Sequence, residues 1–258
     1  MTHPWFAGRT PRILAHRGFV PPDADGIVEN SFAAIAAAHA AGAGYIESDC
    51  HVTADGHVVL LHDADLSRVV GDPRPVAQVT LAELERLMSG IGGLITLRQA
   101  LEGFPDVRFN LDVKTEAAAV PVGRAVAPHA ERVLLASFSD ARRRAALDAA
   151  GHFGGGIRPA TSAGTATIAR VLTAVRAHTP WMVRRALAGV DALQIPERRG
   201  PVRVLTPRLI DAAHRCGVEV HVWTVNDPLH MARLVELGVD GLVTDRTDLA
   251  LRAVAKGR

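Results

Sequence analysis

Two carboxylates, Glu47 and Asp49, stand two positions apart in a short apolar segment. Alternate side chains of a β-strand point to the same face, so both carboxylates project together. They would repel each other unless a metal ion, a lysine or arginine partner, or solvent at a strand edge compensates them. At the end of a barrel strand a metal ion is favoured, and oxygen ligands suit Mg²⁺, Ca²⁺ or Mn²⁺. Asp112 can add a third oxygen from a neighbouring strand.

Two histidines lie next to charged residues. His16 and Arg17 follow a short apolar run and precede a glycine, so they lie on a sharp turn, while His62 ends another apolar run. Each of these pairs, taken alone, is common on surface loops. Together with the carboxylates and Lys114 they suit phosphodiester cleavage, because cations neutralise the phosphate while histidines move protons.

Short β-like segments alternate with helical segments along the chain, which is typical of an α/β fold. The predicted strands are 12–15, 45–49, 109–113, 133–136, 154–158, 192–195, 219–224 and 241–244. Helix starts are indicated by capping residues and by prolines in the first turn, at Asn30 or Ser31, Thr80, Thr96, Thr206-Pro207 and Asp227-Pro228. Eight strands with helices between them predict one (β/α)8 TIM-barrel domain over residues 1–258.

The segment Asp55-Gly56 is a strong signal for a β-hairpin turn. Residues 58–61 must then run antiparallel to the second strand, because a parallel crossover needs a dozen or more residues. A two-residue loop would place Asp49 opposite His62, on the same face of the ribbon. We therefore expect an extra β-hairpin after the second strand, which carries His62 back beside Asp49.

The polar residues that interrupt the apolar strands lie at the carboxyl ends of those strands. They are His16, Arg17, Glu47, Asp49, Asp112, Lys114 and Trp223. In a parallel barrel all eight βα loops converge at this rim, so the pattern predicts a site there. By contrast, His51 and His57 in the hairpin are expected to face outward, and the histidines of helices and loops are expected on the surface.

Composition narrows the class of protein. The chain has 258 residues, 48% of them hydrophobic, and a formal net charge of +2, which argues against the basic stripe that nucleic-acid binding needs. The amino-terminal segment does not resemble a secretory signal, and no apolar run is long enough to predict a membrane span, so we expect a cytoplasmic protein. Cys50 and Cys216 allow one disulfide, although two cytosolic thiols are the simpler interpretation.

Several short motifs, in this order and spacing, resemble the glycerophosphodiester phosphodiesterase family over nearly the whole chain. They are Ala15-His16-Arg17-Gly18, Glu29-Asn30-Ser31, Glu47-Ser48-Asp49, Thr53-Ala54-Asp55-Gly56, Leu61-His62-Asp63, Asn110-Leu111-Asp112-Val113-Lys114, Trp223-Thr224-Val225-Asn226 and Asp240-Gly241-Leu242-Val243-Thr244-Asp245. The resemblance implies the same barrel with its hairpin.

The resemblance also implies roles for the acidic residues and the histidines. His16 and His62 would be the acid/base pair, and Glu47, Asp49 and Asp112 would hold one divalent ion, Mg²⁺ or Ca²⁺, with Mn²⁺ as a further candidate. The third ligand position is often glutamate in the family, and Asp112 is shorter by one methylene group.

The remaining roles concern the phosphate and its surroundings. The resemblance implies that Arg17 and Lys114 hold the phosphate, and that Trp223 packs against the glycerol or its neighbour. Glu29 would brace the site from behind, and Asn30 would cap the helix that follows.

The expected activity is hydrolysis of a small-molecule glycerophosphodiester to glycerol 3-phosphate and an alcohol. A lysophospholipase-D-like hydrolase would use the same core but needs an apolar groove for the acyl chain. A non-catalytic glycerophosphodiester-binding protein would not need two proton carriers. A sugar-phosphate isomerase or aldolase would not need the acidic trio. The sequence leaves the head group, the resident metal and the oligomeric state open.

Overall fold

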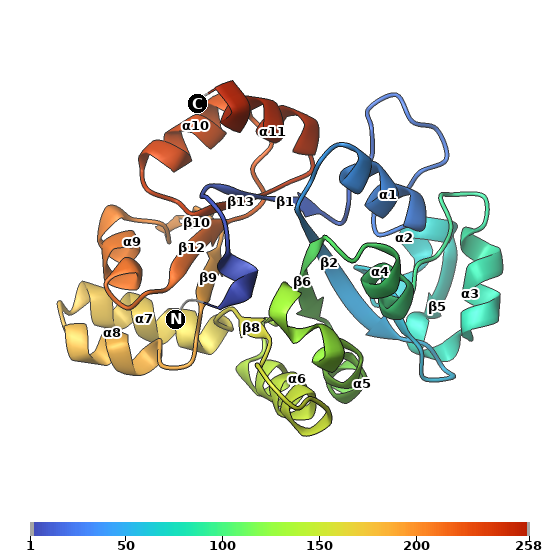
Figure 1. The fold of residues 1–258 in the computed structure, drawn as a ribbon, viewed down its shortest axis with the longest axis horizontal. Coiled ribbons are helices and arrows are strands. Elements are labelled where there is room, and N and C mark those ends of the chain that lie inside the picture. Colours follow the sequence, from blue (N-terminus) through green and yellow to red (C-terminus); the bar gives the residue numbers. More distant parts are fainter. Residues whose placement is uncertain (1–2, 257–258) are drawn as a thin grey trace.

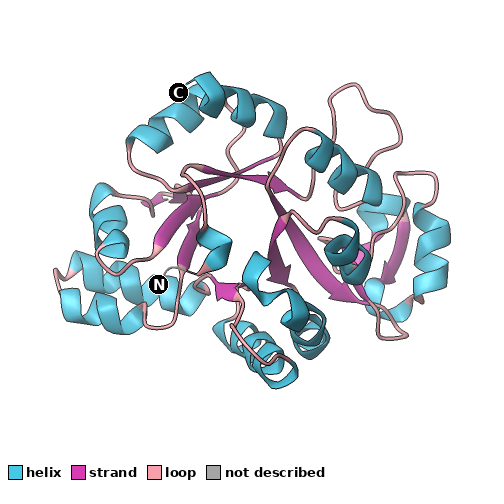
Figure 2. Cartoon of the chain, in the orientation of Figure 1, coloured by secondary structure: helices cyan, strands magenta, loops and turns pink. Residues whose placement is uncertain are grey.

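The short apolar segments form a ring of parallel strands wrapped by helices (Figures 1 and 2). The computed structural model describes residues 3–256. The parallel strands are β1 (Arg12–His16), β2 (Tyr45–Val52), β6 (Arg108–Val113), β7 (Val133–Ala136), β8 (Ala160–Thr161), β9 (Ala192–Ile195), β12 (Glu219–Val222) and β13 (Gly241–Thr244).

The strands are hydrogen-bonded in the order β8-β7-β6-β2-β1-β13-β12-β9. A parallel bridge between Ser162 and Ala192 joins the two ends of this series. Beside the bridge, the backbone amide of Ala163 donates to the carbonyl of Ala192 over 3.0 Å. The result is a nearly closed barrel, as the sequence predicted.

Helices follow most of the strands and cover the outside of the ring (Figure 2). They are α1 (Phe32–Ala40), α2 (Ser67–Val70), α3 (Leu81–Met88), α4 (Leu97–Gly103), α5 (Glu116–Val126), α6 (Asp140–Phe153), α7 (Thr165–Arg176), α8 (Pro180–Ala186), α9 (Pro207–His214), α10 (Pro228–Glu236) and α11 (Thr247–Lys256). Short 3-10 helices are η1 (Pro4–Phe6), η2 (Val76–Gln78) and η3 (Ala127–Arg132).

The predicted helix starts are confirmed at most positions, since Thr80, Thr96, Thr206 and Asp227 each cap a helix through the side-chain oxygen. The prediction that Asn30 caps α1 is wrong, because Ser31 accepts the bond from the Ala34 amide. Asn30 instead adopts a left-handed backbone, with φ of 58°, and points its side chain toward β2.

The predicted fifth strand at 154–158 is also wrong. That segment is a glycine-rich loop, and the strand β8 begins two residues later, at Ala160. Glycine is a poor strand former because it has no side chain to pack, whereas Ala160 and Thr161 are fully buried between β7 and the bridge to Ala192.

The hairpin after β2 has the predicted direction and a different register. The strand β3 (Val58–Leu60) runs antiparallel to β2, but Cys50 faces Leu60, so Asp49 lies opposite Leu61 and not opposite His62. The shift of one residue arises because the loop holds three residues, 54–56, between Thr53 and His57. Gly56 takes the left-handed position, with φ of 85°, that such a loop requires.

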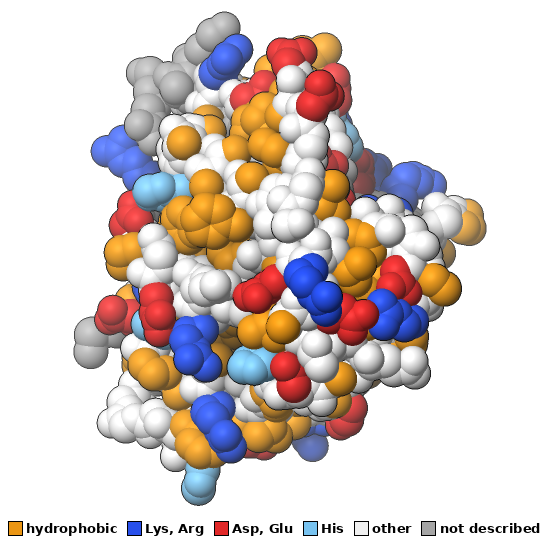
Figure 3. All heavy atoms as spheres, turned by 90° about the vertical axis from the view of Figure 1, so that its right-hand side faces the viewer, with side chains coloured by type: hydrophobic (Ala, Val, Ile, Leu, Met, Phe, Trp, Pro, Cys, Tyr) orange, Lys and Arg blue, Asp and Glu red, His pale blue; other side chains and the backbone are white. Residues whose placement is uncertain are grey.

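Two further hairpins decorate the barrel. One pairs β4 (Asp65–Leu66) with β5 (Asp72–Pro75), and the other pairs β10 (Arg198–Arg199) with β11 (Val202–Arg203). On the face that carries α3, acidic, basic and apolar side chains are interspersed (Figure 3). Exposed ion pairs such as Arg74 with Glu83 contribute at most ~1 kcal/mol each.

The amino-terminal end of the barrel is filled by η1, which lies in the middle of the ring of strands (Figure 1). Trp5 is fully buried there and donates from its indole to the carbonyl of Phe109 over 3.0 Å. Beside it, Arg12 makes two hydrogen bonds to Glu219, at 2.8 and 2.7 Å. Leaving either charge of such a buried pair alone typically costs about 3–5 kcal/mol.

Within residues 3–256, no helix combines the length and apolarity needed to cross a membrane. Both cysteines are free thiols in this part of the chain, with Cys50 buried under the hairpin.

The turn after β1 depends on a close approach to α1. Gly18 has φ of 84°, and a Cβ atom there would lie 2.7 Å from the backbone carbon and oxygen of Ala34. The hydrogen bond from the Phe19 amide to the Ala34 carbonyl, at 2.9 Å, holds the two segments together. Only glycine fits, and its neighbours His16 and Arg17 are placed by this contact.

We predict that Gly18→Ala destabilises the protein more than Gly42→Ala. Both glycines have left-handed φ, at 84° and 89°, but a Cβ at Gly42 meets nothing within 4 Å. Each substitution costs about 1–2 kcal/mol for the backbone, and Gly18→Ala adds roughly 1–3 kcal/mol of overpacking. Chemical denaturation of both variants measures the difference, and equal losses would contradict the proposed contact.

Candidate active site

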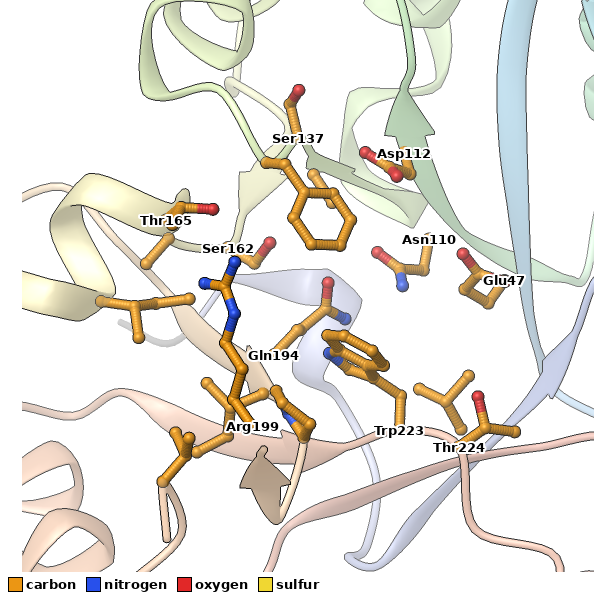
Figure 4. Close-up of a pocket in the computed structure, with 18 of the residues that line it drawn as sticks. Glu47, Asn110, Asp112, Ser137, Ser162, Thr165, Gln194, Arg199, Trp223 and Thr224 are labelled. Atoms are coloured by element: carbon orange, nitrogen blue, oxygen red, sulfur yellow. The ribbon is translucent and has the colours of Figure 1, made fainter. Parts of the chain in front are cut away.

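A cavity of about 650 Å³ opens at the carboxyl ends of the barrel strands. Its lining includes every predicted catalytic and metal-binding residue and the predicted phosphate-binding residues: His16, Arg17, Glu47, Asp49, His62, Asp112, Lys114 and Trp223. Figure 4 shows the cavity from the side of Trp223 and Arg199.

Strand register brings the polar side chains of the rim into rows. His16 of β1 pairs with Glu47 of β2, and Glu47 pairs with Asn110 of β6. One step further toward the rim, Asp49 pairs with Asp112. Residues two apart share a face of a strand, so both rows point into the barrel mouth.

The Lys114 ammonium lies between the two carboxylates of the upper row, 2.7 Å from Asp49 and 2.7 Å from Asp112. Burial lowers the pKa of Lys114, but the two carboxylates outweigh it and raise that pKa well above its usual value. Asp49 also accepts from the Asn30 amide at 3.0 Å and lies 3.3 Å from Arg17. The charge of Asp49 is therefore compensated by three neighbours.

Glu47 has no comparable partner. Burial, and then the nearby charge of Asp49, raise the pKa of Glu47 to about 8. Its Oε2 atom, together with Oδ1 of Asp112 and Oδ1 of Asn110, is buried and accepts no hydrogen bond from the described residues. Buried oxygens without donors are costly, and they are what a hard divalent cation binds.

Between residues 3 and 256, no three acidic, histidine or cysteine side chains converge closely enough to form a metal cluster. Asp49 and Asp112 both contact the Lys114 ammonium, at 2.7 Å each. The donor set nevertheless fits a divalent ion, because Glu47, Asp112 and Asn110 each present a free buried oxygen.

His16 is tied to the end of the neighbouring strand β13. Its Nδ1 lies 2.6 Å from Asp245, and its Nε2 lies 3.9 Å from Glu47. Burial lowers the pKa of His16, but the hydrogen bond to Asp245 and the charge of Glu47 more than offset it, so the pKa is raised. The Asp245 contact orients the ring and leaves Nε2 for the cavity.

His62 has the same arrangement. Its Nδ1 lies 2.7 Å from Asp63, whose other oxygen accepts from Arg68 at 2.6 Å. Behind it, His51 is buried and its Nε2 lies 3.2 Å from the His62 carbonyl. The prediction that His51 faces outward is therefore wrong: residues of equal parity share a strand face, and His51 follows Glu47 and Asp49 on the inner face.

The remaining predicted residues lie around these two histidine–carboxylate pairs, His16 with Asp245 and His62 with Asp63. Arg17 has a left-handed backbone, with φ of 57°, and its guanidinium donates to Glu29 at 2.7 Å. Glu29 thus contacts Arg17 from behind the cavity. Trp223 forms an edge-to-face pair with Phe138, with ring centroids 6.0 Å apart, across the cavity mouth.

Asn110 and Gln194 line the cavity and Asp245 contacts His16, and the sequence assigned no role to these three residues. Asp245 and Asn110 stand in two of the motifs that carry the family resemblance, and that position was the available signal. Gln194 is the one polar residue of an apolar strand, Ala192–Ile195, just before its carboxyl end. Polar residues at the carboxyl ends of apolar strands were taken to mark the site, as for Glu47, and the same rule would have identified Gln194.

Comparison with known proteins agrees with this geometry. Residues 16–249 match the glycerophosphoryl diester phosphodiesterase family. A probable glycerophosphodiester phosphodiesterase 2 of Mycobacterium tuberculosis is 37% identical over 240 residues, which are 92% of this chain and 88% of that protein. Lysophospholipase D GDPD1 of Rattus norvegicus is 31% identical over 117 residues, 40% of this chain and 36% of that protein.

The fold has close counterparts among solved structures. The putative glycerophosphoryl diester phosphodiesterase of Silicibacter pomeroyi aligns with a TM-score of 0.75 at 23% identity, over 99% of this chain and 98% of that one. The barrel fold is thus shared with that protein. From the match over residues 16–249 and the 37% identity to a near full-length relative, the chain belongs to the glycerophosphoryl diester phosphodiesterase family.

Proposed function

We propose that this protein hydrolyses glycerophosphodiesters to glycerol 3-phosphate and an alcohol, with His16 and His62 as the acid/base pair. The observation that carries the proposal is the pair of imidazole–carboxylate dyads, His16 with Asp245 and His62 with Asp63, whose histidines line one cavity. In each dyad the carboxylate fixes Nδ1 and leaves Nε2 to exchange a proton with substrate.

The charged groups of the same cavity suit a phosphodiester. Arg17 offers a planar guanidinium, and Lys114 a compact cation, to the non-bridging phosphate oxygens. The Lys114 ammonium contacts Asp49 and Asp112 at 2.7 Å each. A bound phosphate would therefore compete with these two carboxylates for the ammonium. We propose that these two cations stabilise the negative charge that develops as the phosphate reacts.

We propose that Glu47, Asp49 and Asp112 hold one divalent cation, Mg²⁺, Mn²⁺ or Ca²⁺, and that Asn110 supplies a further oxygen. The free buried oxygens of Glu47, Asp112 and Asn110 support this assignment. When bound, such a cation supplies Lewis-acid neutralisation of phosphate charge. Its positive charge would also remove the penalty that raises the pKa of Glu47 to about 8.

We propose an order of proton transfers by analogy with related barrel phosphodiesterases. The glycerol 2-hydroxyl attacks phosphorus while one histidine takes its proton, and the other histidine protonates the departing alkoxide. Water then opens the resulting cyclic phosphate, with the two histidines in exchanged roles. Each histidine thus returns to its starting state after one turnover.

One observation favours a second candidate. Part of the cavity wall is apolar, formed by Ile168 and Leu172 of α7 and by Ile195 and Val204, and such a wall could accommodate the acyl chain of a lysophospholipid. A lysophospholipase-D-like activity would use the same dyads. Release of choline from glycerophosphocholine and from lysophosphatidylcholine, measured side by side, distinguishes the two. We expect the deacylated substrate to have the higher kcat/KM, and the reverse order would favour the second candidate.

We predict that the enzyme requires a divalent cation. Exhaustive dialysis against chelator should abolish activity, and Mg²⁺, Mn²⁺ or Ca²⁺ should restore it. The same ions should raise the Tm of the wild type, because a ligand that binds only the folded state stabilises it. Glu47→Gln should lose this thermal shift. Full activity of a protein that elemental analysis shows to be metal-free would contradict the prediction.

We predict that His16→Ala and His62→Ala each lower kcat on glycerophosphocholine by at least ~10²-fold, the usual contribution of acid–base catalysis. The variant that lacks the acid should recover on a nitrophenyl diester, whose leaving group hardly needs protonation. Single-turnover release of nitrophenol measures this. His39→Ala, which removes an exposed histidine paired with Asp106, is the control and should remain active. Near-normal kcat in both site variants would refute the assignment.

A further inference from the structure

One region of the cavity presents uncharged side chains. Ser162, Gln194 and Trp223 line it (Figure 4). The ring of Phe138 packs edge-to-face against Trp223, with centroids 6.0 Å apart. Arg198 and Arg199 line the same cavity, but these four side chains carry no charge. Their surfaces suit a ligand group with carbon–hydrogen faces and hydroxyls.

Gln194 is held in place from inside the barrel. Its Nε2 atom lies 3.3 Å from Nδ1 of His221, a fully buried histidine on the next strand. The other ring nitrogen of His221 lies 3.0 Å from Glu219. Glu219 in turn accepts two hydrogen bonds from Arg12, at 2.8 and 2.7 Å. A chain of contacts thus runs from the amino-terminal end of the barrel to the cavity.

This chain determines which way the Gln194 amide points. An ionised carboxylate only accepts hydrogen bonds, so Nε2 of His221 must carry a proton and donate to Glu219. In the neutral imidazole Nδ1 is then an acceptor, and the Gln194 amide nitrogen must donate to it. The amide oxygen is left on the other side, and Figure 4 shows it pointing into the cavity between Ser162 and Asn110.

We propose that the Gln194 amide oxygen accepts a hydrogen bond from the terminal hydroxyl of the substrate's glycerol, and so determines specificity for a free glycerol end. The proposal rests on the proposed function, since glycerol is the part common to all glycerophosphodiesters. A neutral oxygen suits a hydroxyl donor, whereas an ammonium group would be matched better by a carboxylate. Trp223 and Phe138 would then pack against the carbon–hydrogen faces of the glycerol.

The assignment has a direct consequence for substrate choice. A 1-acyl lysophospholipid carries an ester where the terminal hydroxyl would be, so it has no proton to donate. The amide oxygen of Gln194 would be left without a partner in that complex, and an unpaired buried acceptor is costly. Gln194 therefore favours deacylated substrates.

The test compares glycerophosphocholine with its propane-1,2-diol analogue, which keeps the 2-hydroxyl and the choline leaving group and lacks only the terminal hydroxyl. The readout is the ratio of the two kcat/KM values for choline release. This ratio does not depend on how much of a variant is folded. The wild type should favour glycerophosphocholine by about tenfold, the value of one hydrogen bond with its unpaired penalty.

Two variants make the ratio specific to Gln194. Gln194→Met, of similar shape without the acceptor, should bring the ratio close to one. Thr165→Val, at the start of α7 on the cavity wall, is the control and should preserve the preference.

A wild type that hydrolyses both substrates equally well would overturn the assignment of Gln194 and leave the proposed function standing. A Gln194→Met variant that retains the full preference would overturn it as well. A wild type that hydrolyses neither substrate, with divalent cation present, would overturn the proposed function itself.

Discussion

The buried negative charge at the mouth of the barrel is the constraint around which the site is arranged. Glu47, Asp49 and Asp112 are buried close together, and mutual repulsion in a poorly solvated place must be compensated. Lys114 compensates two of them, at 2.7 Å from each. Glu47 remains, with its pKa raised to about 8 by burial and by its neighbour Asp49. The need of this residue for a proton or a cation links the fold directly to the proposed metal dependence.

The apolar interior of the parallel barrel stabilises the fold enough to hold these buried charges together. The strands are largely apolar, and the side chains of the charged rim stand at their carboxyl ends, while Arg12 and Glu219 pair at the amino-terminal end. The register pairs His16 with Glu47 and Glu47 with Asn110 on neighbouring strands, so these side chains lie in one row. Gly18, pressed against α1, fixes the turn that holds His16 in that row.

We propose that two parts of the cavity have different tasks. The part that contains His16 and His62 would bind the phosphate, whose charge is the same in every substrate. The part that contains Gln194 and Trp223 would bind the glycerol. Gln194 contacts the buried His221, which contacts Glu219, so on the proposed assignment the interior of the barrel would take part in substrate choice.

The sequence by itself determined the barrel, the direction of the hairpin and the rim on which the site lies. These follow from local signals: apolar segments, capping residues, and the rule that places Glu47 and Asp49 on one strand face. Only the tertiary structure determined which charged side chains contact each other in the site. Asp245 orients His16 from 229 residues away, and Lys114 stands between two carboxylates, because strand order and closure bring them together. No local pattern records such long-range contacts.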